Sequence, residues 1–151
     1  PERVFQADLQ DGALDLWIQS GDSISLIAAR KAFAHWLISG FPLVILTPAI
    51  GLMLGVPMQQ MLPAMLGYAM GGLTFFLWGG VAAALAASVA RAGLLIAVIA
   101  LPFYVPAIIF GVRVAEEGLN GVGLPFLGAS MLFALGVAPP AMGAALLLAA
   151  D

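Results

Sequence analysis

The chain has 151 residues, of which 63% are hydrophobic and only 9% are charged, with a formal net charge of −3. A soluble domain carries about 25% charged residues, so this composition predicts a membrane protein. The negative charge and the lack of a basic patch argue against nucleic-acid binding, and the absence of cysteine excludes disulfides and thiolate metal sites.

The first 31 residues are the most polar part of the chain, and we expect them to form a cytoplasmic segment, residues 1–31. Asp11 and Asp15 would lie on its polar face. An apolar stripe with helical spacing would lie opposite, made by Leu14, Trp17 and Ile18. Helices that lie flat on membranes usually carry basic polar faces, whereas this one is acidic. Docking into a groove of a partner protein is therefore favoured over plain membrane contact, and both interpretations stay open.

Two cations precede the first apolar stretch, and two amphipathic side chains follow them. Arg30 and Lys31 would meet the lipid headgroups, and His35 and Trp36 come within two helical turns. We therefore expect these four residues to be membrane-interface anchors. His35 could alternatively ligate haem iron, but an interfacial histidine paired with Trp36 is the simpler interpretation.

Four apolar stretches each reach the ~20 residues that a helix needs to cross ~30 Å of hydrocarbon. They are residues 33–55, 61–90, 93–112 and 122–150. Backbone polar groups inside lipid must bond within their own segment, so we expect helices. The predicted fold class is an all-α, polytopic transmembrane helical bundle, with a transmembrane domain over residues 32–151.

Lysine and arginine placement predicts the orientation in the membrane. The positive-inside rule puts residues 1–31 and the loop at Arg91 in the cytoplasm. A short turn at residues 55–60 and a longer loop at 113–121 would then face outside, and the chain would be a multi-pass protein.

Prolines and glycines inside the apolar stretches raise two structural questions. Pro125 and the Pro139-Pro140 pair could divide the last stretch into a re-entrant piece and a crossing helix. The steps Gly51–Gly55 and Gly67–Gly71 have the spacing of close helix contacts, although such spacing is common by chance in a chain with 18 glycines.

The apolar stretches hold little reactive chemistry. None has Asp, Glu, Lys or Arg near its middle, which argues against an ion-coupled carrier. No phosphate-binding loop of the P-loop type occurs, so we expect a non-catalytic chain with ATP hydrolysis in a separate subunit. Five methionines are interpreted as packing residues and not as soft metal ligands: Met53, Met58, Met61, Met65 and Met70.

One tyrosine lies deep in the third stretch, between two prolines. Tyr104 follows Pro102 and precedes Pro106. Its hydroxyl either donates to a carbonyl that a proline has freed, or contacts a cargo molecule or a moving helix. We keep both interpretations, and the three residues form a candidate site for a conformational or cargo contact.

Three segments together resemble a known family: ERVFQADLQDGALDLWI, KAFAHWLISGFPLVILTP and LPFYVPAIIFG. The resemblance covers essentially the whole chain and is to the haem exporter protein B family, the membrane permease subunit of the cytochrome c maturation system. It implies a location in the bacterial inner membrane. Members of this family typically have six spans, and residue 1 here is proline, so we expect about two further helices upstream.

The resemblance also implies partners and a docking site. It implies an ABC-type permease that pairs with a separate ATP-binding subunit through a short cytoplasmic helix, here about residues 2–19. The implied docking residues are Asp11, Gly12, Leu14, Asp15 and Trp17.

Further implied partners are a haem-handling membrane protein, a small membrane subunit and a periplasmic haem chaperone. Haem would be transported, or ATP-driven motion would release the haem-loaded chaperone. A non-transporting scaffold for these proteins and a permease of another ABC exporter are the alternatives.

Overall fold

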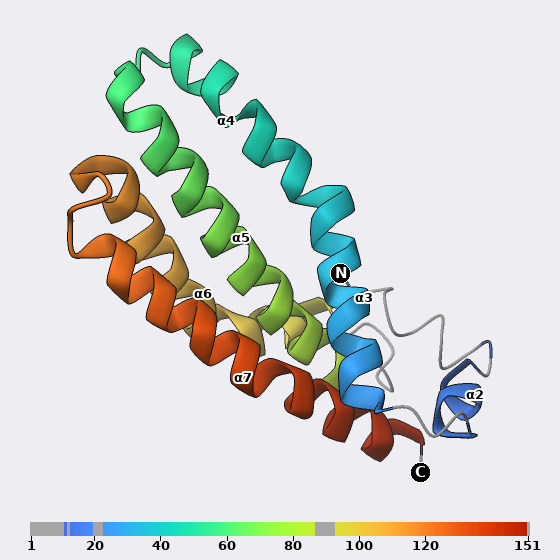
Figure 1. Ribbon diagram of the computed structural model, residues 1–151. Helices are drawn as coiled ribbons and strands as arrows, with labels where there is room; N and C mark the ends of the chain where they lie inside the picture. Colours follow the sequence, from blue (N-terminus) through green and yellow to red (C-terminus); the bar gives the residue numbers. More distant parts are fainter. Residues whose placement is uncertain (1–10, 12, 20–22, 87–92, 151) are drawn as a thin grey trace.

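The computed structural model describes residues 11, 13–19, 23–86 and 93–150, and these residues are helical apart from short connections (Figure 1). The helices are α2 (Ala13–Gln19), α3 (Ile24–Ser39), α4 (Phe41–Met53), α5 (Met58–Leu85), α6 (Gly93–Glu117) and α7 (Gly123–Ala150). The described part of the chain contains no strand, which confirms the predicted all-α class.

Four helical stretches are long and apolar enough to cross a membrane, which confirms the prediction of four spans. They are Ile24–Met53, Met58–Leu85, Val98–Glu117 and Gly123–Ala149. The predicted outer loop at 113–121 is mostly wrong, because α6 continues to Glu117. Arg113 and Glu117 lie one turn apart, and their ion pair of 2.8 Å supports this last turn.

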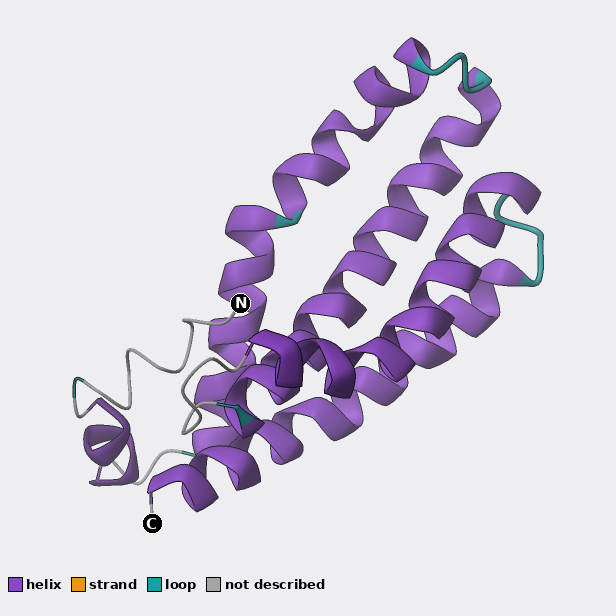
Figure 2. Ribbon diagram, turned by 180° about the vertical axis from the view of Figure 1, so that it is seen from behind, coloured by secondary structure: helices purple, strands orange, loops and turns teal. Residues whose placement is uncertain are grey.

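Helix α5 occupies the centre of the bundle. Figures 1 and 2 show α4 along one side of α5, with α6 and α7 on the other. The half of α5 that faces α3 and α7 is built of small residues and is buried, from Gly79 to Ala84. Small side chains let neighbouring helix backbones approach closely, which is how spanning helices associate without a hydrophobic driving force.

The turn between α4 and α5 explains why the chain reverses there. Gly55 has φ +73°, a left-handed conformation that glycine adopts without strain. The N–H of Val56 donates to the carbonyl of Gly51 at 2.8 Å, and the N–H of Gly55 donates to Leu52 at 3.1 Å. This pair of bonds is the Schellman motif that ends helices, and Pro57 then precedes the first turn of α5.

One of the two predicted glycine contacts is present. A Cβ on Gly67 would lie 2.8 Å from the carbonyl oxygen of Gly111, so α5 and α6 touch backbone to backbone at this point. The Gly51–Gly55 step makes no such contact: Gly51 faces the Met61 side chain, and Gly55 lies in the turn.

The last span was expected to be interrupted and the first to be continuous, and the structure shows the reverse. Pro139 and Pro140 lie inside α7, which runs without interruption, so the last span is not divided. The first span instead breaks at Gly40, between α3 and α4, as Figure 2 shows. Pro42 supplies no N–H for the helix ladder just after this point, which together with Gly40 accounts for the break.

Candidate functional site

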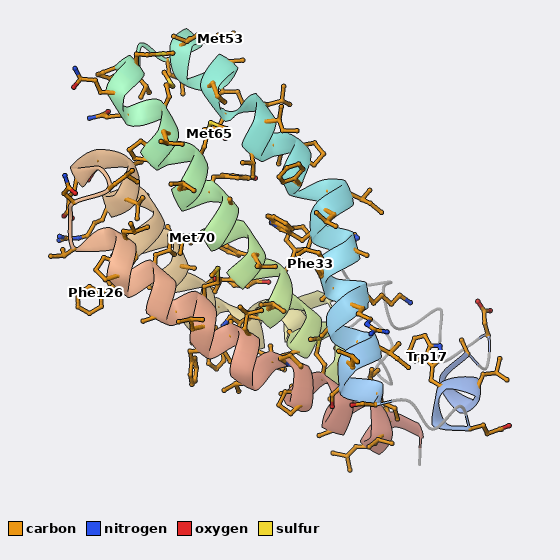
Figure 3. All side chains as sticks on the ribbon, viewed as in Figure 1. Trp17, Phe33, Met53, Met65, Met70 and Phe126 are labelled. Atoms are coloured by element: carbon orange, nitrogen blue, oxygen red, sulfur yellow. The ribbon has the colours of Figure 1, made fainter. Side chains whose placement is uncertain are left out.

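Helix α2 lies beside the end of the bundle where α3 begins (Figures 1 and 3). Its Trp17 packs against the buried core cluster, and the Lys31 Nζ atom lies 5.5 Å from the centroid of the Trp17 ring. Trp17 therefore attaches α2 to this chain's own bundle through a cation–π contact. Leu16 is 66% exposed, and Asp11 is exposed beside the start of the helix.

Three further residues were predicted to dock with a partner: Gly12, Leu14 and Asp15. Gly12 lies outside the described residues. The backbones of Leu14 and Asp15 belong to α2, but their side chains also lie outside the described part. The exposed side chains that the structure describes on α2 and just before it are Asp11, Leu16 and Gln19.

The predicted interface anchors all lie on α3, but they do not form the expected pair. Arg30 is exposed and Lys31 is half-buried under Trp17. His35 packs edge-on against Phe76 of α5, with 5.3 Å between the ring centroids, and not against Trp36. Lys31 and His35 are four residues apart, so they share one face of α3.

Trp36 is the buried residue at the break in the first span. It is 8% exposed, stacks on Phe33 of α3 with 5.6 Å between ring centroids, and makes an edge contact with Phe41 of α4 at 5.8 Å. Cβ atoms added to its glycine neighbours would lie 2.7 Å from Cδ1 at Gly40 and 3.1 Å from Nε1 at Gly72. Trp36 Nε1 has no hydrogen-bond partner among the described residues, which is unusual for a buried polar atom.

An open, mostly apolar groove runs along α5 between α4 and α6, and we call it the α5 groove. Its volume is about 630 Å³. Its lining residues are Thr47 of α4, then Ala64, Gly67, Tyr68, Gly71, Gly72, Phe75 and Phe76 of α5, and Ala107, Ile108, Gly111, Val112 and Ala115 of α6. The groove lies between helices that are long and apolar enough to cross a membrane.

Two side chains bring hydroxyl groups to the α5 groove. Thr47 donates to the carbonyl of Leu43 at 2.9 Å, so its hydroxyl is satisfied. Tyr68 is 42% exposed, and its hydroxyl makes no hydrogen bond to any described residue. A molecule in the groove would therefore meet one open hydroxyl in otherwise apolar surroundings.

This groove was not predicted from the sequence. A signal was present in one stretch of α5, where Gly67, Gly71 and Gly72 alternate with the aromatic residues Tyr68, Phe75 and Phe76. Glycines beside aromatic side chains on one helix leave space that only a neighbouring helix can close, and the position of that neighbour is a tertiary property.

In the structure Tyr104 packs against α5, and it does not line the α5 groove. The Tyr104 ring lies 4.2 Å from that of Phe75, and a Cβ on Gly79 would lie 2.8 Å from the Tyr104 hydroxyl. No carbonyl of the described residues accepts a bond from this hydroxyl. Pro102 is exposed on α6 and Pro106 is half-buried. A contact of this site with cargo or with a moving helix stays a prediction.

The methionines do not converge on a common point. Figure 3 shows Met53 near the end of α4 and Met65 and Met70 apart along α5. Met53 and Met58 are exposed, whereas Met61 is buried against Gly51. Among the described residues, no three His, Asp or Glu side chains gather as a metal site.

Comparison with known proteins identifies the family. The family model described as "CcmB protein" matches residues 1–149. "Heme exporter protein B" of Bradyrhizobium diazoefficiens is 39% identical over 150 residues, which cover 96% of this chain and 68% of that protein. The protein of the same name from Pseudomonas aeruginosa is 35% identical over 149 residues, with 96% and 67% covered.

A relative of lower identity also matches over nearly the whole chain. "Heme exporter protein B" of Haemophilus influenzae is 32% identical over 154 residues, which cover 99% of this chain and 70% of the relative. The chain thus spans about two-thirds of the length of the curated relatives that it matches. The four apolar helices make it a multi-pass membrane protein, and the match over 149 residues shows that it belongs to the CcmB protein family.

Proposed function

We propose that this chain is the membrane permease subunit of an ABC-type exporter that serves haem delivery in cytochrome c maturation. Its relatives carry the name "Heme exporter protein B", and the family match covers almost the whole chain, which is the observation that carries the proposal. The chain itself does not hydrolyse ATP in this proposal. A separate ATP-binding subunit supplies the energy from the cytoplasmic side of the bacterial inner membrane.

Helix α2 is the proposed point of entry for that energy. It contacts the bundle through Trp17 and Lys31, and it offers the exposed Leu16 and Asp11 to a partner. A short helix with an acidic end and an exposed apolar side chain fits a groove in a partner protein. Movement of α2 would pass to α3 through the contact at Lys31.

The packing of α3 suggests how movement would travel further. Ala28 and Ala32 are buried, and a Cβ on Gly80 of α5 would lie 3.5 Å from that of Ala32. Gly143 of α7 lies directly against Ser25. We therefore expect α3 to move with α7 as one body, and α4 to move against α5 and α6 about the break at Gly40. This movement would deliver haem, or release a haem-loaded chaperone, at the outer face.

A double substitution, which reverses one charge and replaces one apolar side chain by a charged one, tests the docking step. The double variant Asp11→Lys and Leu16→Glu changes only exposed positions, so it leaves the bundle intact. We expect it to abolish association with the ATP-binding subunit and the change in ATP turnover that the permease causes. Glu116→Lys is the matched control, because it reverses an exposed charge at the far end of the bundle.

Two outcomes contradict the proposal. If the double variant retains both association and coupled ATP turnover, α2 is not the docking helix. If association occurs but ATP turnover never depends on the permease, the chain is a membrane scaffold for the haem-handling proteins and not a transport subunit.

A further inference from the structure

We infer that the α5 groove is a binding site for one acyl chain of a membrane lipid, which lies along α5 between α4 and α6. The inference does not depend on the cargo of the exporter, because it concerns only the groove and the membrane around it. It goes beyond the proposed function because it assigns this chain a lipid site of its own.

The shape of the groove fits a chain and not a helix. Its lining on α5 runs from Ala64 to Phe76, which are twelve residues apart, or about 18 Å of helix. A volume of about 630 Å³ over that length gives a mean cross-section of about 35 Å². An α-helix with its side chains is about 10–12 Å across, which corresponds to a cross-section of about 80 Å² or more. The groove is too narrow to take in a spanning helix, whereas a single file of methylene groups fits along it.

The charge of the lining matches a neutral chain. None of the described residues that line the groove is charged, so nothing there would compensate a charged group taken out of water. Ala64, Gly71 and Ala107 leave only backbone and methyl groups at the surface, so a methylene chain can lie close to α5 and α6. The Tyr68 hydroxyl has no described partner, but Tyr68 is 42% exposed, so the molecule in the groove does not have to satisfy it.

The position of the groove along α5 puts it at the depth of acyl chains. Ala64 comes six residues after the start of the span Met58–Leu85, and Phe76 comes nine residues before its end. The lining therefore occupies the central part of a helix that is long enough to cross ~30 Å of hydrocarbon. At this depth the membrane offers acyl chains and not headgroups.

The groove is continuous with the apolar outer surface of α6. Ile108 and Val112 line the groove, and each is 51% exposed. They share one face of α6 with Leu101 and Val105, which are 58% and 42% exposed. Since lipid and groove are equally apolar, close packing holds the chain there and not the hydrophobic effect. An empty groove would lose the dispersion contacts on one side of its lining.

Photocrosslinking in lipid nanodiscs tests the inference. The membrane protein is placed in phosphatidylethanolamine in which one acyl chain carries a diazirine near its middle, and the crosslinked peptides are mapped by mass spectrometry. We expect the crosslinks to concentrate on residues 64–76 and 107–115. After exchange into detergent, native mass spectrometry should count one retained lipid per chain. Neither readout uses ATP, so both remain valid if the proposed function fails.

Two neighbouring isoleucines supply a matched pair of variants. Ile108 and Ile109 are 51% and 50% exposed on α6, and of the two only Ile108 lines the groove. Ile108→Trp should fill part of the groove and lower both crosslinking to residues 64–76 and lipid retention by about fivefold or more, whereas Ile109→Trp should leave both unchanged. Val112→Trp is a second filling variant at an exposed position, and it should act in the same direction as Ile108→Trp.

A third variant identifies the chemistry of the occupant. Tyr68→Phe removes the hydroxyl and keeps the ring, so an acyl chain should bind as it does in the wild type. Loss of the lipid in this variant would show that a hydrogen bond holds the occupant, which overturns the inference. It is also overturned if the two isoleucine variants behave alike, if the crosslinks spread evenly over the exposed apolar faces, or if they spare the groove because protein covers it.

Discussion

The two halves of the first span differ both in composition and in surroundings: α3 carries Arg30, Lys31 and His35, whereas α4 carries no charged residue. In α3, Ala28, Ala32 and Trp36 are buried, and the helix packs on both α5 and α7. In α4, only Val44 and Gly51 are buried, and the helix packs on α5 with the groove beside it. Hydropathy does not explain this difference in burial, because the less apolar half, α3, is the more buried one.

Side-chain size, and not apolarity, therefore decides which half of the first span is tightly packed. Spanning helices gain little from burying apolar surface, because lipid is equally apolar, and they gain from close packing of small residues. The α3 half lies close to glycines of α5 and α7: a Cβ on Gly80 would lie 3.5 Å from that of Ala32, and Gly143 lies directly against Ser25. The α4 half presents large side chains, among them Ile45 and Leu46, to the outside.

The largest expected loss of stability comes from disrupting the packing of α3 against α5 and α7. In Gly80→Leu the new side chain would meet the Met142 Sδ atom, which lies 2.7 Å from the position of a Cβ. We expect a loss of about 3 kcal/mol in the free energy of unfolding, because both α3 and α7 must move away. Thermal unfolding in nanodiscs measures it. Gly136→Leu is the control, since nothing lies within 4 Å of its Cβ position, and an equal loss there would refute the packing argument.

A pair of leucine truncations compares the bundle core with the α4 half directly. Leu77 is 2% exposed in the core, and Leu52 is 62% exposed on α4. We expect Leu77→Ala to cost about 2 kcal/mol because it leaves a cavity, and Leu52→Ala to cost less than about 0.5 kcal/mol because lipid fills the space. Denaturation in the same nanodiscs checks both values. Equal costs would mean that α4 is as tightly packed as the core.

A substitution of Trp36, at the break between the two halves, should change the free energy of unfolding less than the core substitutions above. Trp36→Phe keeps an aromatic ring between Phe33 and Phe41 and removes the N–H that has no described partner. The lost packing and the removed desolvation penalty oppose each other, so we expect a net change within about 1 kcal/mol. A thermal shift that corresponds to a much larger destabilisation would show that the indole N–H has an acceptor in the folded protein.

The smallest effect is expected at the far end of the bundle. Glu117 accepts from Arg113 at 2.8 Å and from the N–H of Gly123 at 3.3 Å, at a partly exposed position. Glu117→Gln should cost about 0.5 kcal/mol, and the difference from the wild type should shrink at high salt, because exposed ion pairs are screened. Unfolding at low and high ionic strength is the measurement, and a salt-independent difference would contradict this assignment.

Much of the fold follows from the sequence. Four apolar stretches predict four helices, and Gly55 before Val56-Pro57 predicts the turn that the structure contains. The error at residues 113–117 arose because charged residues suggested a loop, whereas Arg113 and Glu117 are spaced to support a helix. The break at Gly40 was missed because Pro42 looks like the other prolines that the helices tolerate.

The candidate site was less predictable. Trp36 was expected at the membrane interface, but three neighbours from α3, α4 and α5 bury it, and no local pattern encodes that. Tyr68 drew no attention, because a lone tyrosine in a span has no distinctive spacing. The docking residues of α2 stay a prediction from family resemblance, since the described surface there is limited to a few side chains.

The most direct test is a distance measurement between spin labels, which the absence of cysteine makes simple. One label pair, Leu52→Cys and Val112→Cys, spans α4 and α6, and the other, Leu26→Cys and Leu148→Cys, spans α3 and α7; all four positions are exposed. The complex with the ATP-binding subunit is measured without nucleotide and with a non-hydrolysable ATP analogue. We predict that nucleotide changes the α4–α6 distance and leaves the α3–α7 distance unchanged; an unchanged α4–α6 distance, or an equal change in both pairs, would contradict the account.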